Sequence, residues 1–170
     1  MNNIVIYPSK IKMFVAAIGS LLFVLLYFYL YYNRETLNPP LLTSWVFPIA
    51  FYIGVPFFGF GFVYFSYRLL SPKPAVIISD EGIFDNSSMV SAGMLKWEEI
   101  SYIFTYDFMG QHFLGIVPVE SEAVIGRLPY FKRFFLSMNE LWGTPPISIS
   151  ETILPVSVDE LLEQISEYLR

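Results

Sequence analysis

Two long uncharged segments near the N-terminus constrain the fold of this chain more than any other feature. Met13–Tyr32 is a run of twenty residues without a charged side chain, and Leu37–Tyr67 is a second such run. At about 1.5 Å of rise per residue, a twenty-residue helix is roughly 30 Å long, the thickness of a bilayer's hydrocarbon core. Backbone groups in lipid must be satisfied within their own segment, so both runs should be helical. We therefore predict a transmembrane hairpin over residues 13–67, with spans at about 13–32 and 46–67.

Other interpretations of these runs explain the sequence less well. Two buried helices of a soluble protein would need neither the spanning length nor aromatic residues gathered at the ends of the runs. A cleaved signal peptide has a shorter apolar core and is followed by a small-residue cleavage site. Pro56 is expected to kink the second span, and Asn38-Pro39-Pro40 to form the turn between the spans. The spacings Ala16-xxx-Ser20 and Ala50-xxx-Gly54 favour close packing of the two helices.

The charges that flank the hairpin predict its orientation. Four cations border its two outer ends: Lys10, Lys12, Arg68 and Lys73. The intervening turn carries only Arg34, and the adjacent Glu35 offsets that charge. Lys and Arg accumulate on the cytoplasmic side of membrane proteins. Both termini are therefore expected to be cytoplasmic, in a protein integral to a bacterial inner membrane.

The remainder of the chain, residues 71–170, is predicted to be a cytoplasmic domain with one modest core. Residues 69–170 carry six Lys/Arg and fourteen Asp/Glu, a net charge of −8, which argues against nucleic acid as a partner. The chain has no Cys and a single histidine, His112, so neither a disulfide framework nor a zinc site is expected. No Ser-His-Asp set or nucleophile motif occurs at recognisable spacing. We expect no catalytic residue, no cofactor and no metal, and therefore a protein that is not an enzyme.

Hydrophobic periodicity divides the domain into short strands followed by helices. The strands are expected at residues 75–79, 83–85, 89–92, 101–106, 112–119 and 146–150, and the helices at 121–127, 130–141 and 158–169. Ser157 and Glu160 form a capping box at the start of the last helix. Trp97 is expected to be a half-buried core residue with its N–H satisfied. In the leader, residues 1–12, Ile4–Tyr7 is either a strand that joins the domain or a disordered segment.

This order of elements resembles that of bacterial two-span membrane proteins with a pleckstrin-homology-like cytoplasmic domain. The resemblance is carried by Val76–Ile83 (VIISDEGI), by Leu95–Ile100 (LKWEEI) and by Ser157–Leu169 as the closing helix. It differs from the plain pattern in an insertion, Glu120–Gly143, which a small group of these proteins shares. The resemblance implies an α+β fold, with an antiparallel sheet or partial barrel closed by a C-terminal amphipathic helix, and it implies no enzymatic activity.

One cluster of cations is a candidate contact with lipid or with a partner. Arg127, Lys132 and Arg133 are half of the positive charges in residues 69–170, and they flank aromatic residues of the helix at 130–141. A basic amphipathic helix near a bilayer can rest on anionic headgroups. The favoured alternative is that this helix packs its aromatic face, Phe131, Phe134 and Phe135, on the domain core, because a small domain needs apolar area.

These observations predict a non-enzymatic, membrane-anchored interaction module that binds a protein or a lipid of the inner leaflet. Two other functions remain compatible with the sequence. One is an immunity-type protein that neutralises a toxin at the membrane. The other is an accessory subunit of a channel or transporter, which would need to form a homo-oligomer because neither span contains an ionisable residue.

Overall fold

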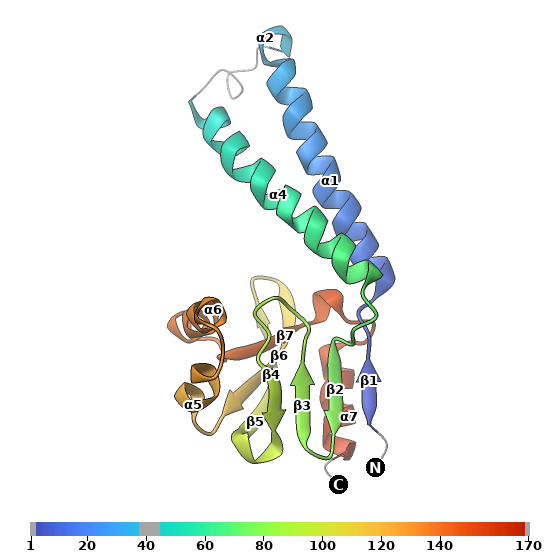
Figure 1. Ribbon diagram of the computed structural model, residues 1–170, viewed down its shortest axis with the longest axis vertical. Helices are drawn as coiled ribbons and strands as arrows, with labels where there is room; N and C mark the ends of the chain where they lie inside the picture. The colour runs from blue at the N-terminus through green and yellow to red at the C-terminus, as the bar shows by residue number, and fades with distance from the viewer. Residues whose placement is uncertain (1–2, 38–44, 169–170) are drawn as a thin grey trace. The chain divides into compact units, whose positions relative to one another are not determined.

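The computed structural model describes residues 3–37 and 45–168, which divide into two compact units (Figure 1). One unit is the helical hairpin, residues 10–71. The other contains residues 72–170 together with the first nine residues, so the predicted leader is divided: residues 1–9 belong to the mixed domain, and residues 10–12 belong to the hairpin. The chain is thus of the α+β class, with two long apolar helices and antiparallel sheets.

The hairpin unit contains the helices α1 (Lys10–Tyr32), α2 (Arg34–Leu37) and α4 (Val46–Leu70). Helices α1 and α4 are long and apolar enough to cross a membrane. No side chain is buried in the most apolar stretch of α4, whereas a core helix of a soluble protein is mostly buried. Each helix is three residues longer than the predicted span, because α1 begins at Lys10 and α4 ends at Leu70. The predicted turn at Asn38-Pro39-Pro40 lies outside the described residues.

Small residues allow α1 and α4 to approach each other closely. A Cβ atom on Gly54 would lie 2.8 Å from the Tyr27 ring, and one on Gly61 would lie 3.2 Å from the Ser20 hydroxyl oxygen. Aromatic rings fill the space between these positions, with Phe23 and Phe58 stacked at 4.5 Å between centroids. The predicted role in close helix packing is therefore confirmed for Ser20 and Gly54, while that of Ala16 and Ala50 stays a prediction. Gly61 is a further contact that the spacing had not indicated.

The absence of native cysteine allows a direct test of this helix packing. A Cβ on Gly61 would lie 3.8 Å from Ser20 Cβ, which matches the usual separation in a disulfide. We expect the Ser20→Cys/Gly61→Cys variant to form an intramolecular disulfide on mild oxidation in membranes, read as a shift on non-reducing gels. Ser20→Cys/Gly59→Cys is the matched control, since a Cβ on Gly59 meets no atom within 4 Å. Equal cross-linking of the two pairs would contradict this packing.

The domain unit begins with a four-stranded antiparallel sheet in the order β1-β2-β3-β4. Its strands are β1 (Ile4–Ile6), β2 (Val76–Ser79), β3 (Gly82–Asp85) and β4 (Gly93–Lys96). Of the two alternatives for the leader, the strand is correct, because β1 pairs with β2 through the register Ile4↔Ile78 and Ile6↔Val76.

The strand predicted at 89–92 is wrong. Those residues form a loop, and the strand starts at Gly93, whose φ of +78° ends the turn before it.

A second, three-stranded antiparallel sheet has the order β5-β6-β7. Its strands are β5 (Ile100–Phe108), β6 (Gln111–Pro118) and β7 (Ile147–Ser150). A 3-10 turn, η1 (Trp97–Glu99), leads into β5, and a second, η2 (Glu151–Ile153), follows β7. Neither sheet closes into a barrel. The antiparallel sheets are therefore confirmed, and a closed barrel is excluded for the described strands.

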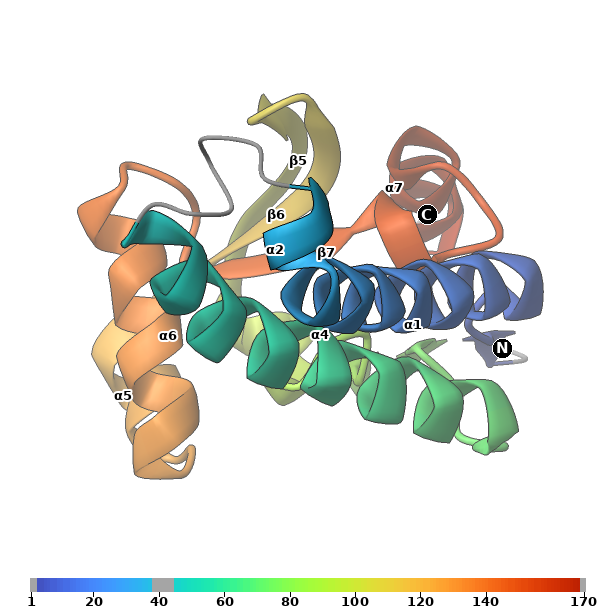
Figure 2. The same ribbon diagram turned by 90° about the horizontal axis from the view of Figure 1, so that it is seen from above.

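Three helices complete the domain: α5 (Ser121–Gly126), α6 (Tyr130–Leu141) and α7 (Val158–Tyr168). One hydrogen bond of the capping box predicted for α7 is present, since Glu160 N–H donates to the Ser157 hydroxyl at 3.1 Å. α7 packs on β5 and β6 and buries Leu161 and Ile165 in the core. α5 and α6 lie side by side in both views (Figures 1 and 2). The core between the sheets and α7 is aliphatic, with Ile78 and Leu114 among its fully buried residues.

A buried carboxylate organises the loop between β3 and β4. The two carboxylate oxygens of Asp85 accept hydrogen bonds from Ser87 N–H at 2.9 Å and Ala92 N–H at 3.1 Å. Burial raises the pKa of the Asp85 carboxyl, against the lowering effect of these hydrogen bonds and of the Lys132 charge. Ser87 and Ala92 are themselves buried, so without the carboxylate their N–H groups would lack a hydrogen-bond acceptor.

Replacing this carboxylate should destabilise the domain. Asp85→Ala leaves two buried N–H groups without an acceptor, so we expect a loss of about 1–3 kcal/mol in the free energy of unfolding. The exposed Asp107→Ala is the control, with an expected loss below about 1 kcal/mol. The measurement is urea unfolding of the full chain in mild detergent, followed by Trp97 fluorescence after Trp45→Phe and Trp142→Phe. Equal losses in the two variants would contradict a structural role for Asp85.

Candidate binding groove

The long strand β5 lies at an open edge of the second sheet. It is nine residues long and pairs with β6, and it has no second partner among the described strands. In an antiparallel edge strand, alternate residues point their N–H and C=O groups away from the sheet. β5 therefore presents a row of backbone donors and acceptors that a further extended segment can pair with.

A groove of about 290 Å³ lies beside this edge. Its walls come from η1 and β5 on one side and from α7 on the other. The lining residues are Trp97, Ile100, Ser101, Tyr102, Ile103, Leu162, Ile165 and Ser166. The lining is mainly apolar, with one serine contributed from each side. The groove is therefore suited to an apolar side chain next to a hydrogen-bonding backbone.

Contacts with the rest of the domain fix the walls of the groove. The indole N–H of Trp97 donates to Ser79 O at 2.9 Å, which joins η1 to the first sheet. Tyr102 is 56% exposed, and its ring stacks on Phe104 with centroids 5.6 Å apart. The β5–β6 register shifts between Ile100 and Tyr102, which leaves Ser101 as an extra residue in β5. A bulge of this kind re-aims side chains at the end of a strand.

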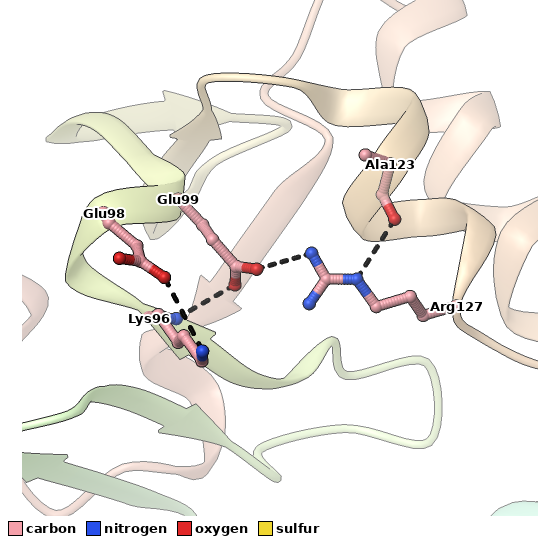
Figure 3. A network of polar contacts seen from close by, with 5 residues as sticks. All are labelled: Lys96, Glu98, Glu99, Ala123 and Arg127. Carbon is pink, nitrogen blue, oxygen red and sulfur yellow. Dashed lines mark hydrogen bonds and ion pairs between the residues drawn. The ribbon is translucent and has the colours of Figure 1, made fainter.

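A polar network holds η1 against α5 next to the groove (Figure 3). The Glu99 carboxylate accepts from Lys96 N–H at 3.1 Å and from an Arg127 amino group at 2.5 Å. Arg127 Nε also donates to Ala123 O at 3.2 Å. The hydrogen bond from Arg127 is the main reason that the pKa of the Glu99 carboxyl is lowered. Because β5 begins at the next residue, this network sets the position at which the open edge begins.

The lowered pKa of Glu99 gives a pH-dependent contribution to stability. The contribution is present above the ordinary pKa of a glutamate and is lost as the pH falls through the lowered value of the folded state. Glu99→Gln removes it, so we expect a loss of roughly 0.2–1 kcal/mol at pH 7 that shrinks on acidification. Urea unfolding of both proteins in mild detergent between pH 7 and pH 3, with the Trp97 reporter, measures it. A difference that is constant with pH would show that the charge of Glu99 has no role.

The structure places each of the predicted contact residues in an intramolecular hydrogen bond. Arg127, at the C-terminal end of α5, is bound to Glu99 and Ala123. Lys132 on α6 donates from Nζ to Ser91 O at 2.8 Å. Arg133 donates from Nε to Leu128 O at 2.6 Å. The three side chains bond to different parts of the domain, and their contact with lipid or with a partner stays a prediction.

The expectation that α6 packs its aromatic face on the core is wrong. Phe131, Phe134 and Phe135 are exposed, and the buried residue of α6 is Leu136.

His112 is exposed and pairs with Asp107 across the β5–β6 hairpin, with 2.5 Å between Nδ1 and Oδ1. Within the described residues, no group of three or more His, Cys, Asp or Glu side chains could hold a metal ion.

Sequence patterns had not indicated the groove. Leu162 packs at the edge of the core and also lines the groove. Ser101 and Ser166 carry no motif. The sequence of β5 is mostly a run of β-prone aromatic and aliphatic residues. Such a run indicates a strand, but it does not indicate that one edge of the strand is open.

Comparisons of the chain with protein-family models, with curated proteins and with solved structures found no match. The function of the groove is therefore inferred from its geometry and chemistry.

Proposed function

We propose that this protein is a non-enzymatic binding module anchored in a bacterial inner membrane. In this proposal α1 and α4 cross the bilayer, both termini are cytoplasmic, and the domain is pleckstrin-homology-like. Its groove takes an extended segment of a protein partner, which adds as a strand to the open edge of β5. The nine-residue unpaired edge beside an apolar groove is the observation that carries this proposal.

Strand addition is supported by the way the two parts of the groove complement each other. The outer backbone groups of β5 supply hydrogen bonds that do not depend on sequence, and pockets beside such an edge select alternate side chains of the added strand. Here the pocket is formed by Ile103, Leu162 and Ile165. The preferred ligand is therefore an extended segment with an apolar residue at every second position.

Charge further limits the class of ligand. α7 borders the groove, and its solvent-exposed side includes the carboxylates of Glu163 and Glu167. Residues 69–170 as a whole carry a net charge of −8. Like charges across an interface disfavour binding, and opposite charges speed association. A neutral or basic segment is favoured over an acidic one.

The membrane anchor is supported by the properties of the hairpin. Both helices reach spanning length, and the outward-facing residues of α4 include large apolar side chains such as Phe57 and Phe60. The cations at the outer ends of the hairpin favour cytoplasmic termini. The pleckstrin-homology-like assignment is supported by the two antiparallel sheets with a C-terminal helix packed on β5 and β6.

Selection from a library of displayed nonapeptides, with the full chain in mild detergent as the target, tests the proposed function. We expect enrichment of peptides with apolar residues at alternate positions and few acidic residues. Ser101→Lys places a charge at the open edge and should weaken binding of a selected peptide at least about tenfold. Gln111→Lys, an exposed residue at the other end of the β5–β6 hairpin, is the matched control and should bind as the parent does.

Hydrogen exchange gives a second readout of the same complex. Addition of a strand should slow exchange of the outward amides of β5 and leave the exchange of β1 unchanged. Failure to enrich any peptide, or equal binding by the two lysine variants, would overturn the assignment of the groove.

A further inference from the structure

Helix α6 is attached to the domain by an unusual face. Leu136 is its buried residue, and Lys132, Met138 and Asn139 are half-buried, so two of the four inward residues are polar. Lys132 donates to Ser91 O, and Asn139 Nδ2 donates to Pro146 O at 3.1 Å. The Lys132 charge also acts on the buried Asp85 carboxylate. Hydrogen bonds and charge thus hold α6 in place together with apolar burial.

The opposite side of α6 is apolar and open to solvent. Six large residues on the helix and at its C-terminal end are between 40% and 83% exposed: Tyr130, Phe131, Phe134, Phe135, Leu141 and Trp142. The rings of Phe131 and Phe135 contact each other at 4.9 Å between centroids, as do those of Phe134 and Phe135 at 5.5 Å. From here on, the name aromatic face, used above for Phe131, Phe134 and Phe135, covers all six residues. A surface of this kind marks a site of interaction.

We propose that the aromatic face inserts into the interfacial layer of the lipid bilayer in which the hairpin is anchored. This inference rests on the proposed membrane placement of α1 and α4. The occupant is lipid because of the composition of the face and because of the tether. Tyr and Trp concentrate at the headgroup level, and Phe and Leu enter the acyl boundary beneath it.

The tether limits how far the domain can move from the bilayer. Only Tyr7–Ser9 separate β1 from α1, and only Ser71–Ala75 separate α4 from β2. Chains of three and five residues span at most roughly 10 and 18 Å. Both ends of the hairpin are held in this way, so the domain stays next to the membrane surface in any orientation. A helix with an apolar outer face then has lipid within reach at high effective concentration.

Apolar insertion, and not attraction of the three cations to anionic lipid, is the main contribution in this proposal. Arg127, Lys132 and Arg133 already bond to groups of the domain. The aromatic face itself bears no charge. Immersion should therefore be the same in vesicles of neutral phosphatidylcholine and in vesicles with added anionic phosphatidylglycerol.

Site-directed spin labelling of the full chain in these two kinds of vesicle tests the inference. Single cysteines replace Phe134 in the aromatic face, Glu163 on the polar side of α7 and Phe57 on the outside of α4. The collision rates of each label with oxygen, which enters lipid, and with a water-soluble nickel complex report its depth. We expect the labels at 57 and 134 to be accessible to oxygen and the label at 163 to be accessible to nickel. Adding Phe131→Ser and Phe135→Ser should shift the label at 134 to the aqueous pattern.

The outcomes separate this inference from the proposed membrane anchor. An aqueous label at 57 would overturn the anchor and, with it, this inference. A lipid pattern at 57 with an aqueous pattern at 134 would overturn the inference alone. A label at 134 protected from both reagents would overturn it in favour of a covering protein surface, such as a second copy of the chain. Immersion at 134 only in anionic vesicles would return the interaction to the cations.

Discussion

The pairing of β1 with β2 is the interaction on which the architecture depends. It joins Ile4–Ile6 to Val76–Ser79, so the two segments that flank the hairpin become neighbouring strands of one sheet. Ile6 and Ile78 are buried there, and Ala75 N–H donates to Ile6 O at 2.8 Å. The hairpin is thus an insertion between two adjacent strands, and both of its ends are tied to one hydrophobic core. Loss of β1 would free one end and expose the edge of β2.

The buried Asp85 connects the core to the surface chemistry. Its carboxylate has little water to solvate it, which makes a nearby cation favourable. Lys132 lies close enough to lower the Asp85 pKa, and its Nζ donates a hydrogen bond to Ser91 O. Because Lys132 is turned inward, the aromatic residues on the other side of α6 must face outward. A polar contact inside the domain therefore produces an apolar surface outside it.

The two surfaces of the domain are suited to different kinds of contact. The groove between β5 and α7 combines a hydrogen-bonding edge with a narrow apolar pocket, which suits a single extended segment. The aromatic face is broad and has no such edge, which suits a fluid apolar layer. In the proposed roles, recognition by either surface follows from shape, exposed backbone and apolar area.

The sequence by itself determined the elements that depend on local periodicity. Uncharged runs of spanning length indicated α1 and α4, and apolar spacing with a Ser157 cap indicated α7, because these signals lie within one segment. Turn residues located β2 and β3 in the same way. Such patterns report which residues are apolar at a given spacing. In α7, β2 and β3 the apolar residues pack in the core, and α1 and α4 are apolar over a length that could span a membrane.

Tertiary structure decided which partner each face or edge meets. The same periodicity that identified the helix at 130–141 indicated the wrong orientation, since Phe131 and Phe134 are exposed while Lys132 is held by Ser91. The pairing of β1, the start of β4 at Gly93 and the open edge of β5 likewise depend on residues distant in the sequence. The physical reason is that hydrogen bonds between strands and the solvation of a buried charge are long-range properties, whereas helical and strand periodicity are local.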